Sequence, residues 1–256
     1  MLGGGVGPMA GVELHRKIIE QTITGGIDQG HLNLVHFSFS AHISDRTDYL
    51  LKPGISDPGE EMASVVELGL RGLKTGPFSP ERCIVGVPCN TFHAPKIFDS
   101  FTRRLQGYQP GITLVHMLKE SIDMIQVLNP EAKKIGLMST SGTRSSGVWH
   151  ALLESAGYGI TEVAPETQEE LHDTIYNPEW GLKAVSPASE KARKRFSEYA
   201  ETLIAAGADI LILGCTEIPL ALPGRDFKGT AVLDPVLALA RAMIRAAGPE
   251  KLKPLT

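Results

Sequence analysis

Two short apolar runs, each ending in a cysteine that polar residues follow, constrain the fold of this chain most strongly. Residues 83–87 (Cys-Ile-Val-Gly-Val) lead to Cys89, and residues 210–213 (Ile-Leu-Ile-Leu) lead to Cys215. Runs of this length and composition predict buried strands. In an α/β sheet, the cysteines would lie at the carboxyl edge of their strands, where such sheets bind ligands.

The other parts of the chain occur in the same order around each cysteine. A glycine-rich loop at Gly7 precedes Cys89, and a loop of small residues at Gly142 precedes Cys215. Strands alternating with helices predict mostly parallel sheets. We therefore expect an α/β fold of two pseudo-symmetric, Rossmann-like halves whose sheets face a central cleft. Further strands are expected at residues 32–37, 112–115 and 134–138, and helices at 60–74, 121–128, 149–156, 190–206 and 236–247 and from Pro8 onward.

The expected first domain comprises residues 1–116 and 222–256 and carries Cys89, because the last helix is expected to return to the first half. The expected second domain, residues 117–221, carries Cys215. A chain of 256 residues is long enough for two such domains, each with its own core.

Composition excludes several classes of function. The net charge of −4, with scattered Lys and Arg, predicts no nucleic-acid partner. No apolar run is long enough for a membrane span, and the chain does not begin like a secretory signal. Three cysteines without metal-ligand spacing predict free thiols, no metal and a reducing, cytoplasmic location.

The neighbours of Cys89 and Cys215 distinguish them from ordinary core cysteines. A cysteine after an apolar strand is most often a small buried hydrophobe, and Cys83 is interpreted in that way. Polar residues such as Asn90 and Thr216 are instead expected to cap a following helix, whose N-terminus would lower the thiol pKa towards neutrality. Such thiols can take and return a proton, and our hypothesis is a pair of opposed acid/base cysteines.

The glycine-rich loop formally matches a dinucleotide fingerprint as Gly5-x-Gly7-x-x-Ala10. The expected second strand, however, ends in residues 37–40 (Phe-Ser-Phe-Ser), without the acidic residue that binds a ribose. We therefore interpret the glycines as allowing close backbone approach to a small carboxylate.

Five motifs together resemble the aspartate/glutamate racemase family. They are Gly-Gly-Val-Gly-Pro at residues 4–8, Ser-Asp-Arg-Thr at 44–47, Pro-Cys-Asn-Thr-Phe-His at 88–93, Gly-Thr at 142–143 with Ser-Gly at 146–147, and Leu-Gly-Cys-Thr-Glu-Ile-Pro-Leu at 213–220. They occur in the family's order over nearly the whole chain, and the two cysteine motifs are the most specific.

This resemblance implies a homodimer that racemises aspartate or a related acidic amino acid, without pyridoxal phosphate or metal. It implies that Cys89 and Cys215 act on opposite faces of the substrate α-carbon. By the same matching, Asn90, Thr91 and Thr216 would bind the α-carboxylate, and Thr143 and Gly7 would line the site. Arg46 would hold a side-chain carboxylate, with Lys183 as its cationic partner.

The chain departs from the family pattern in two places. Only Met1-Leu2 stands where the family has a complete strand before the glycine loop, which leaves the edge of the cleft open to question. Residues 74–82 replace a compact turn that the second half keeps at residues 206–209; this loop is expected not to affect catalysis.

Alternatives remain open at this point. Arg46 could be a surface arginine paired with Asp45 or Asp48. Within the superfamily, a hydantoin racemase, a maleate isomerase or a decarboxylase would use the same scaffold, although decarboxylases of this type need only one of the cysteines. A non-catalytic sensor of small carboxylates is the alternative from another class, and two retained thiols disfavour it.

Overall fold

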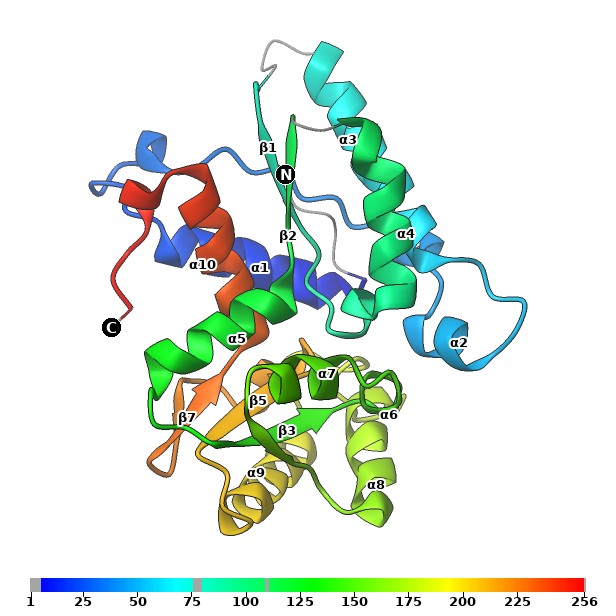
Figure 1. Cartoon of the computed structure of the whole chain (residues 1–256), viewed down its shortest axis with the longest axis vertical. Helices are drawn as coiled ribbons and strands as arrows, with labels where there is room; N and C mark the ends of the chain where they lie inside the picture. The colour runs from blue at the N-terminus through cyan, green and yellow to red at the C-terminus, as the bar shows by residue number, and fades with distance from the viewer. Residues whose placement is uncertain (1–5, 76–79, 109–110, 256) are drawn as a thin grey trace. The chain divides into compact units, whose positions relative to one another are not determined.

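Two α/β units divide the chain between them in the computed structural model, which describes residues 6–75, 80–108 and 111–255 (Figure 1). The first unit comprises Met1–Met117 and Val236–Thr256, and the second comprises Leu118–Pro235. Residues 222–235 therefore lie in the second unit, where the sequence had placed them in the first. The reason is strand pairing: β7 (Thr230–Leu233) pairs in parallel with β5 (Ile210–Gly214) of the second unit.

The first unit is built on two parallel strands, β1 (Cys83–Gly86) and β2 (Ile112–Val115). The helices α3 (Pro58–Thr75) and α4 (Pro95–Leu105) pack together beside them, around a core that includes Phe92 and Phe101. The helix α10 (Pro235–Ala247) approaches β1 closely, because a Cβ at Gly86 would lie 2.6 Å from the Met243 sulfur.

One expectation for the first unit differs from the structure. Residues 32–37 form no strand among the described residues and contain a single bridge position at His36. Arg46 is the first residue of the short helix α2 (Arg46–Leu51), because Asp45 caps that helix by accepting a hydrogen bond from the Asp48 N–H. The helix α1 (Pro8–Gln21) begins as expected, with Gly7 at its N-cap. Two predicted segments lie partly outside the described residues, namely Gly3–Gly5 of the glycine loop and residues 76–79 of the expected loop 74–82.

The second unit contains a larger sheet, with the strand order β4-β3-β5-β7-β6. All its described pairings are parallel except that of β6 (Asp226–Phe227) with β7. Every residue of β5 is buried, as expected for a central parallel strand. The other strands are β3 (Lys134–Ser139) and β4 (Gly159–Thr161), and the helices are α5 (Met117–Leu128), α6 (Ser141–Ser145), α7 (Val148–Ser155), α8 (Pro165–Tyr176) and α9 (Glu190–Ala205).

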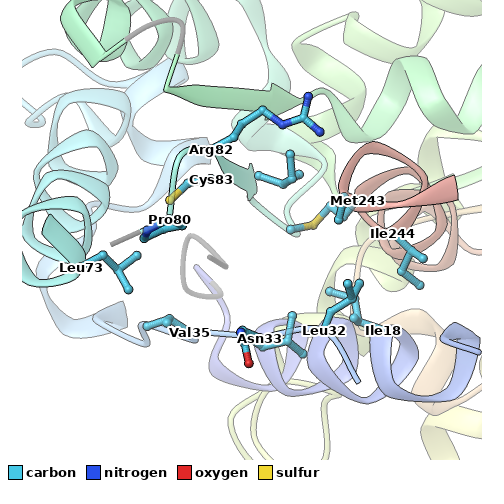
Figure 2. Close-up of a pocket in the computed structure, with 13 residues that line it drawn as sticks. Ile18, Leu32, Asn33, Val35, Leu73, Pro80, Arg82, Cys83, Met243 and Ile244 are labelled. Atoms are coloured by element: carbon cyan, nitrogen blue, oxygen red, sulfur yellow. The ribbon is translucent and has the colours of Figure 1, made fainter. Parts of the chain in front are cut away.

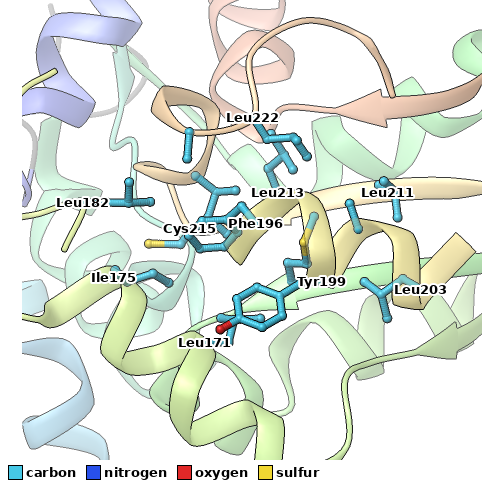
Figure 3. Close-up of a cluster of buried hydrophobic side chains, with 14 of the residues drawn as sticks. Leu171, Ile175, Leu182, Phe196, Tyr199, Leu203, Leu211, Leu213, Cys215 and Leu222 are labelled. Carbon is cyan, nitrogen blue, oxygen red and sulfur yellow. The ribbon is translucent and has the colours of Figure 1, made fainter. Parts of the chain in front are cut away.

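The core of the second unit lies between β5, α8 and α9 (Figure 3). Leu171 and Ile175 come from α8, Phe196 and Tyr199 from α9, and Leu213 from β5. This core reaches the carboxyl end of β5. The alternation of strands with helices and the mostly parallel strand pairing confirm the predicted α/β class.

The chain takes different courses after the two cysteine-bearing strands. After Cys89 comes the 3-10 helix η3 (Thr91–His93) and then α4, so an α-helix follows as expected. After Cys215 there is only the 3-10 helix η5 (Ile218–Leu220), so the expected helix is absent. Pro223 explains the difference, because proline lacks an N–H and disfavours helical geometry at the residue before it. The remaining 3-10 helices are η1 (Asp28–Gly30), η2 (Ser40–His42), η4 (Gln106–Tyr108) and η6 (Pro249–Lys251).

Within the described residues, no helix combines the length and the apolar character needed to cross a bilayer.

Candidate active site

Cys89 lies just beyond the carboxyl end of β1 and is a buried free thiol. Its backbone N–H donates to the Val87 carbonyl at 3.0 Å, which turns the chain sharply out of the strand. Its backbone carbonyl accepts a 2.8 Å hydrogen bond from the Nδ1 of His93. The position of this cysteine is therefore held through its backbone.

His93 is the residue that holds the Cys89 loop in place. Its Nε2 accepts a hydrogen bond from the Met117 N–H at 3.1 Å, so Nδ1 must carry the proton that is donated to Cys89. Burial, together with the nearby His116, lowers the pKa of His93 to about 3. His93 is therefore a neutral imidazole that joins the Cys89 loop to the start of α5.

Asn90 and Thr91 follow Cys89 directly, and both are buried. Asn90 is the N-cap of η3, but its side chain makes no capping hydrogen bond to that turn, contrary to the expectation from the sequence. The turn is closed instead by backbone bonds, including one from the His93 N–H to the Asn90 carbonyl at 3.0 Å. The side chain of Asn90 is therefore not committed to capping.

Arg46 is a buried residue, and its side chain is only 11% exposed. One guanidinium nitrogen donates to the Ser44 carbonyl at 3.3 Å, and another lies 3.9 Å from an Asp45 carboxylate oxygen. Asp48 pairs instead with Lys52 at 2.7 Å. The burial of Arg46 does not fit a surface arginine, whereas its contact with Asp45 agrees with the pairing that this alternative expected.

Cys215 lies one residue beyond β5 in the second unit and is also a buried free thiol. Figure 3 shows it at one end of the apolar core, near Leu182 and Ile175. Its sulfur donates a hydrogen bond to the Oε2 of Glu217 at 3.0 Å. The hydrogen bond at Cys215 therefore involves its sulfur, whereas the hydrogen bond from His93 at Cys89 involves the backbone carbonyl.

Glu217 is the centre of a charged cluster in an otherwise apolar region. Its Oε1 accepts a hydrogen bond from Lys183 Nζ at 2.9 Å, and its Oε2 accepts one from the Thr216 hydroxyl at 3.2 Å. Burial alone would raise the pKa of the Glu217 carboxyl. The Lys183 ammonium and the hydrogen bonds from Cys215, Lys183 and Thr216 reverse this and hold that pKa below its ordinary value.

The pKa of Cys215 moves in the direction opposite to that predicted. Burial, followed by the Glu217 carboxylate, raises the pKa of this thiol well above its usual range, although Lys183 acts the other way. Burial disfavours the charged form of Lys183, but the attraction of Glu217 and Cys215 raises its pKa. The expected lowering required a helix N-terminus, which the chain does not form after Cys215.

Thr143 lies at the same sheet edge as Cys215. The pairing of Ser139 with Gly214 brings the ends of β3 and β5 side by side. Thr140 follows β3 directly and caps α6, because its hydroxyl oxygen accepts a hydrogen bond from the Thr143 N–H at 3.2 Å. The hydroxyl oxygens of Thr140 and Thr143 lie 3.0 Å apart. The buried Thr143 is thus presented next to the loop that carries Cys215.

The structure thus gathers the predicted residues into two groups. The first unit holds Gly7, Arg46, Cys89, Asn90 and Thr91, and the second holds Thr143, Lys183, Cys215 and Thr216. Glu217 and His93 also lie beside the two cysteines, although the sequence motifs do not predict them as site residues. The Cys-x-Glu spacing after β5 is the signal that would have identified Glu217.

A mainly apolar cavity of about 380 Å³ lies elsewhere in the first unit, at the amino end of β1. Figure 2 shows Cys83, Met243 and Val35 around it. Cys83 therefore faces a different region from Cys89, which follows the carboxyl end of the same strand. No group of three His, Cys, Asp or Glu side chains in the described part of the chain is placed to hold a metal ion.

Parallel strands that each deliver a buried thiol to their carboxyl edge define an α/β protein with thiol-based sites. The sequence profile of the Asp/Glu/hydantoin racemase family matches residues 4–243, and the chain belongs to that family.

Three relatives illustrate the likeness. A glutamate racemase from Synechococcus sp. (strain CC9605) is 25% identical over 174 residues, which are 64% of this chain and 57% of that protein. The chain thus matches little more than half the length of this relative. The Picrophilus torridus aspartate racemase superposes with a TM-score of 0.74 at 22% identity, covering 98% of this chain and 96% of that one. A glutamate racemase from Francisella tularensis, in complex with D-glutamate, gives a TM-score of 0.60 at 14% identity, covering 100% and 82%. At these identities the two superpositions establish the fold alone.

Proposed function

We propose that this protein is a racemase of acidic amino acids that uses Cys89 and Cys215 as its acid/base pair. One observation carries the proposal: in a chain of the racemase family, each α/β unit places a buried free thiol just beyond the carboxyl end of a parallel strand. Parallel strand ends are where α/β folds bind ligands.

The proposed reaction balances with two thiols and the substrate alone. A thiolate takes the α-proton, so that an S–H bond forms and the Cα–H bond breaks. The electron pair is delocalised into the α-carboxylate. The second thiol then gives its proton to the opposite face of the α-carbon and becomes the thiolate. No electron leaves or enters, and in the proposed reaction the two thiols carry both proton transfers without pyridoxal phosphate or a metal.

The α-proton of an amino acid is very weakly acidic, so the charge that develops on the α-carboxylate must be stabilised. Asn90, Thr91 and Thr216 are the proposed hydrogen-bond donors, each adjacent to a cysteine or one residue further along. Thr143 and Gly7 would line the same site. Hydrogen bonds that strengthen as negative charge develops on the α-carboxylate would stabilise the transition state more than the bound substrate.

Selectivity for an acidic side chain is assigned to Arg46 and Lys183. The planar guanidinium of Arg46 offers two parallel donors to a carboxylate and is already buried, which strengthens such a contact. Lys183 has three donor protons, of which Glu217 uses one. We assign the other donor protons to a substrate carboxylate.

The test is racemisation of a panel of single enantiomers, scored by chiral chromatography without added pyridoxal phosphate or metal. We expect inversion of aspartate or glutamate and little inversion of alanine or serine. The double variant Cys89→Ala/Cys215→Ala is the matched negative control. In deuterated water, racemisation must also introduce deuterium at the α-carbon. Binding of an acidic amino acid without α-proton exchange would identify a carboxylate-binding protein instead and overturn the proposal.

A further inference from the structure

The hydrogen bond between Cys215 and Glu217 locates a proton. An ionised carboxylate has no hydrogen to donate, so with Glu217 ionised the hydrogen of the 3.0 Å contact with Oε2 belongs to the sulfur. The same oxygen also accepts from the Thr216 hydroxyl, so two donors converge on it. Cys215 is thus seen as a thiol that points its S–H at a carboxylate.

Lys183 is what keeps that carboxylate ionised. Glu217 is 3% exposed, and a buried carboxylate without a partner would take up a proton. The Lys183 ammonium lies 2.9 Å from Oε1 and compensates the charge. The Lys183 side chain is 25% exposed and also lies over the Tyr176 ring, 5.2 Å from its centroid, so it retains some contact with water.

We propose that Glu217, held by Lys183, is a positioning residue that keeps the exchangeable proton on Cys215, so that Cys215 is the acid of the resting enzyme. This proposal deepens the proposed function and rests on it. A carboxylate next to the sulfur opposes a second negative charge there, whereas the same carboxylate accepts the thiol hydrogen. The resting form would therefore take the α-proton with Cys89 and return one from Cys215.

Two charged side chains of the described residues act on the Cys215 sulfur, Glu217 to raise its pKa and Lys183 to lower it. Tyr176 in turn acts on Lys183. Tyr176 stacks on His172 of the same helix at 4.6 Å, and His172 accepts a hydrogen bond from the Ser141 N–H. A change at Glu217 should therefore appear mainly in the titration of Cys215.

The test measures the pH at which alkylation of Cys215 by iodoacetamide reaches half its maximal rate, followed by peptide mass spectrometry in the whole protein. The thiolate is the reactive form, so this midpoint reports protonation separately from access. In Glu217→Gln the opposing charge is lost and Lys183 remains, so the midpoint should fall by at least about one pH unit. In Lys183→Met the pKa of the Glu217 carboxyl rises, but Glu217 is still ionised at the alkaline pH where Cys215 titrates, so the loss of the cation should raise the Cys215 midpoint.

The controls separate this role from a structural one. Glu201→Gln removes an exposed glutamate of the same unit that pairs with Lys228 at 2.7 Å, and it should leave the Cys215 midpoint unchanged. Alkylation of Cys89 in each protein is the internal reference, and thermal unfolding shows that each variant is folded. A purely structural glutamate would not shift the two midpoints in opposite directions.

An unchanged or raised midpoint in Glu217→Gln would overturn the proposal. If Glu217→Gln does not fold, Lys183→Met decides alone, and an unchanged or lowered midpoint there would overturn it. Midpoints that shift as expected in a protein without racemase activity would overturn the proposed function and leave the assignment of the proton to Cys215 intact.

Discussion

Cys89 and Cys215 occupy equivalent positions in the two units, yet different chemistry holds them. Both are buried thiols just beyond the carboxyl end of a parallel strand. Cys89 is held through its backbone carbonyl by the neutral His93. Cys215 is held through its sulfur by the ionised Glu217, which in turn pairs with Lys183.

The comparison shows that the strand end determines where a thiol lies and that its neighbours determine where its proton lies. A neutral imidazole on the backbone places no charge next to the Cys89 sulfur. A carboxylate on the sulfur itself favours the protonated form of Cys215. The two thiols of the proposed racemase therefore differ in the charges that contact them.

Loss of either thiol is expected to have the largest effect and would test whether the two act as one pair. Cys89→Ala and Cys215→Ala should each lower racemisation by about a thousandfold or more, because each lacks either the base or the acid. Each variant keeps one thiol that can take a proton from one enantiomer and return a solvent deuteron to the same face. The two variants should therefore exchange the α-hydrogen of opposite enantiomers without inversion, as measured by NMR in deuterated water.

Cys83→Ala is the control for both variants, because Cys83 is a buried free cysteine at the other end of β1. It should retain activity. Racemisation near the wild-type rate in either of the other variants would show that the thiols do not form a pair. A Cys83→Ala variant as damaged as the other two would also contradict the assignment.

Arg46 is expected to have the next largest effect and would extend the comparison to the substrate side chain. Arg46→Ala should lower kcat/KM for aspartate or glutamate by about a hundredfold, because the proposed bidentate contact with the substrate carboxylate would be lost. Turnover of a neutral amino acid should change much less. Arg16→Ala, which removes an exposed arginine of α1, is the matched control. An equal loss on acidic and neutral substrates would leave Arg46 with a purely structural role.

His93 is expected to affect the pH dependence of stability more than activity at neutral pH. Its pKa is about 3 in the folded protein and about 6.5 in the unfolded chain. The unfolded chain therefore binds the proton first as the pH falls, and stability is lost from about pH 6.5 down towards pH 3. Between pH 7 and pH 5 this residue should contribute a loss of about 2 kcal/mol in the free energy of unfolding.

The measurement is denaturant unfolding at both pH values for the wild type, His93→Asn and His42→Asn. Asparagine keeps a donor near the Cys89 carbonyl but does not titrate, so its variant should show a smaller loss of stability at pH 5. His42 is exposed and its replacement should leave the dependence unchanged. An identical dependence in all three proteins would exclude His93 as its source.

Local sequence determined the elements that carry the thiols. The apolar runs before Cys89 and Cys215 became β1 and β5 within one or two residues of the predicted bounds, because a buried parallel strand needs a continuous apolar run. The alternating order of elements likewise determined the α/β class. The family followed from motifs that are each contiguous in the chain.

Tertiary structure decided what local patterns do not encode. Lys183 lies 34 residues from Glu217, and His93 lies 24 residues from Met117, so neither hydrogen bond follows from neighbouring residues. Residues 222–235 joined the second unit through strand pairing, which is a long-range interaction. The direction of the Cys215 pKa depended on burial and on which charges surround the sulfur once the chain is folded. Sequence therefore determined where the thiols lie along the chain, and only folding determined the charges around them.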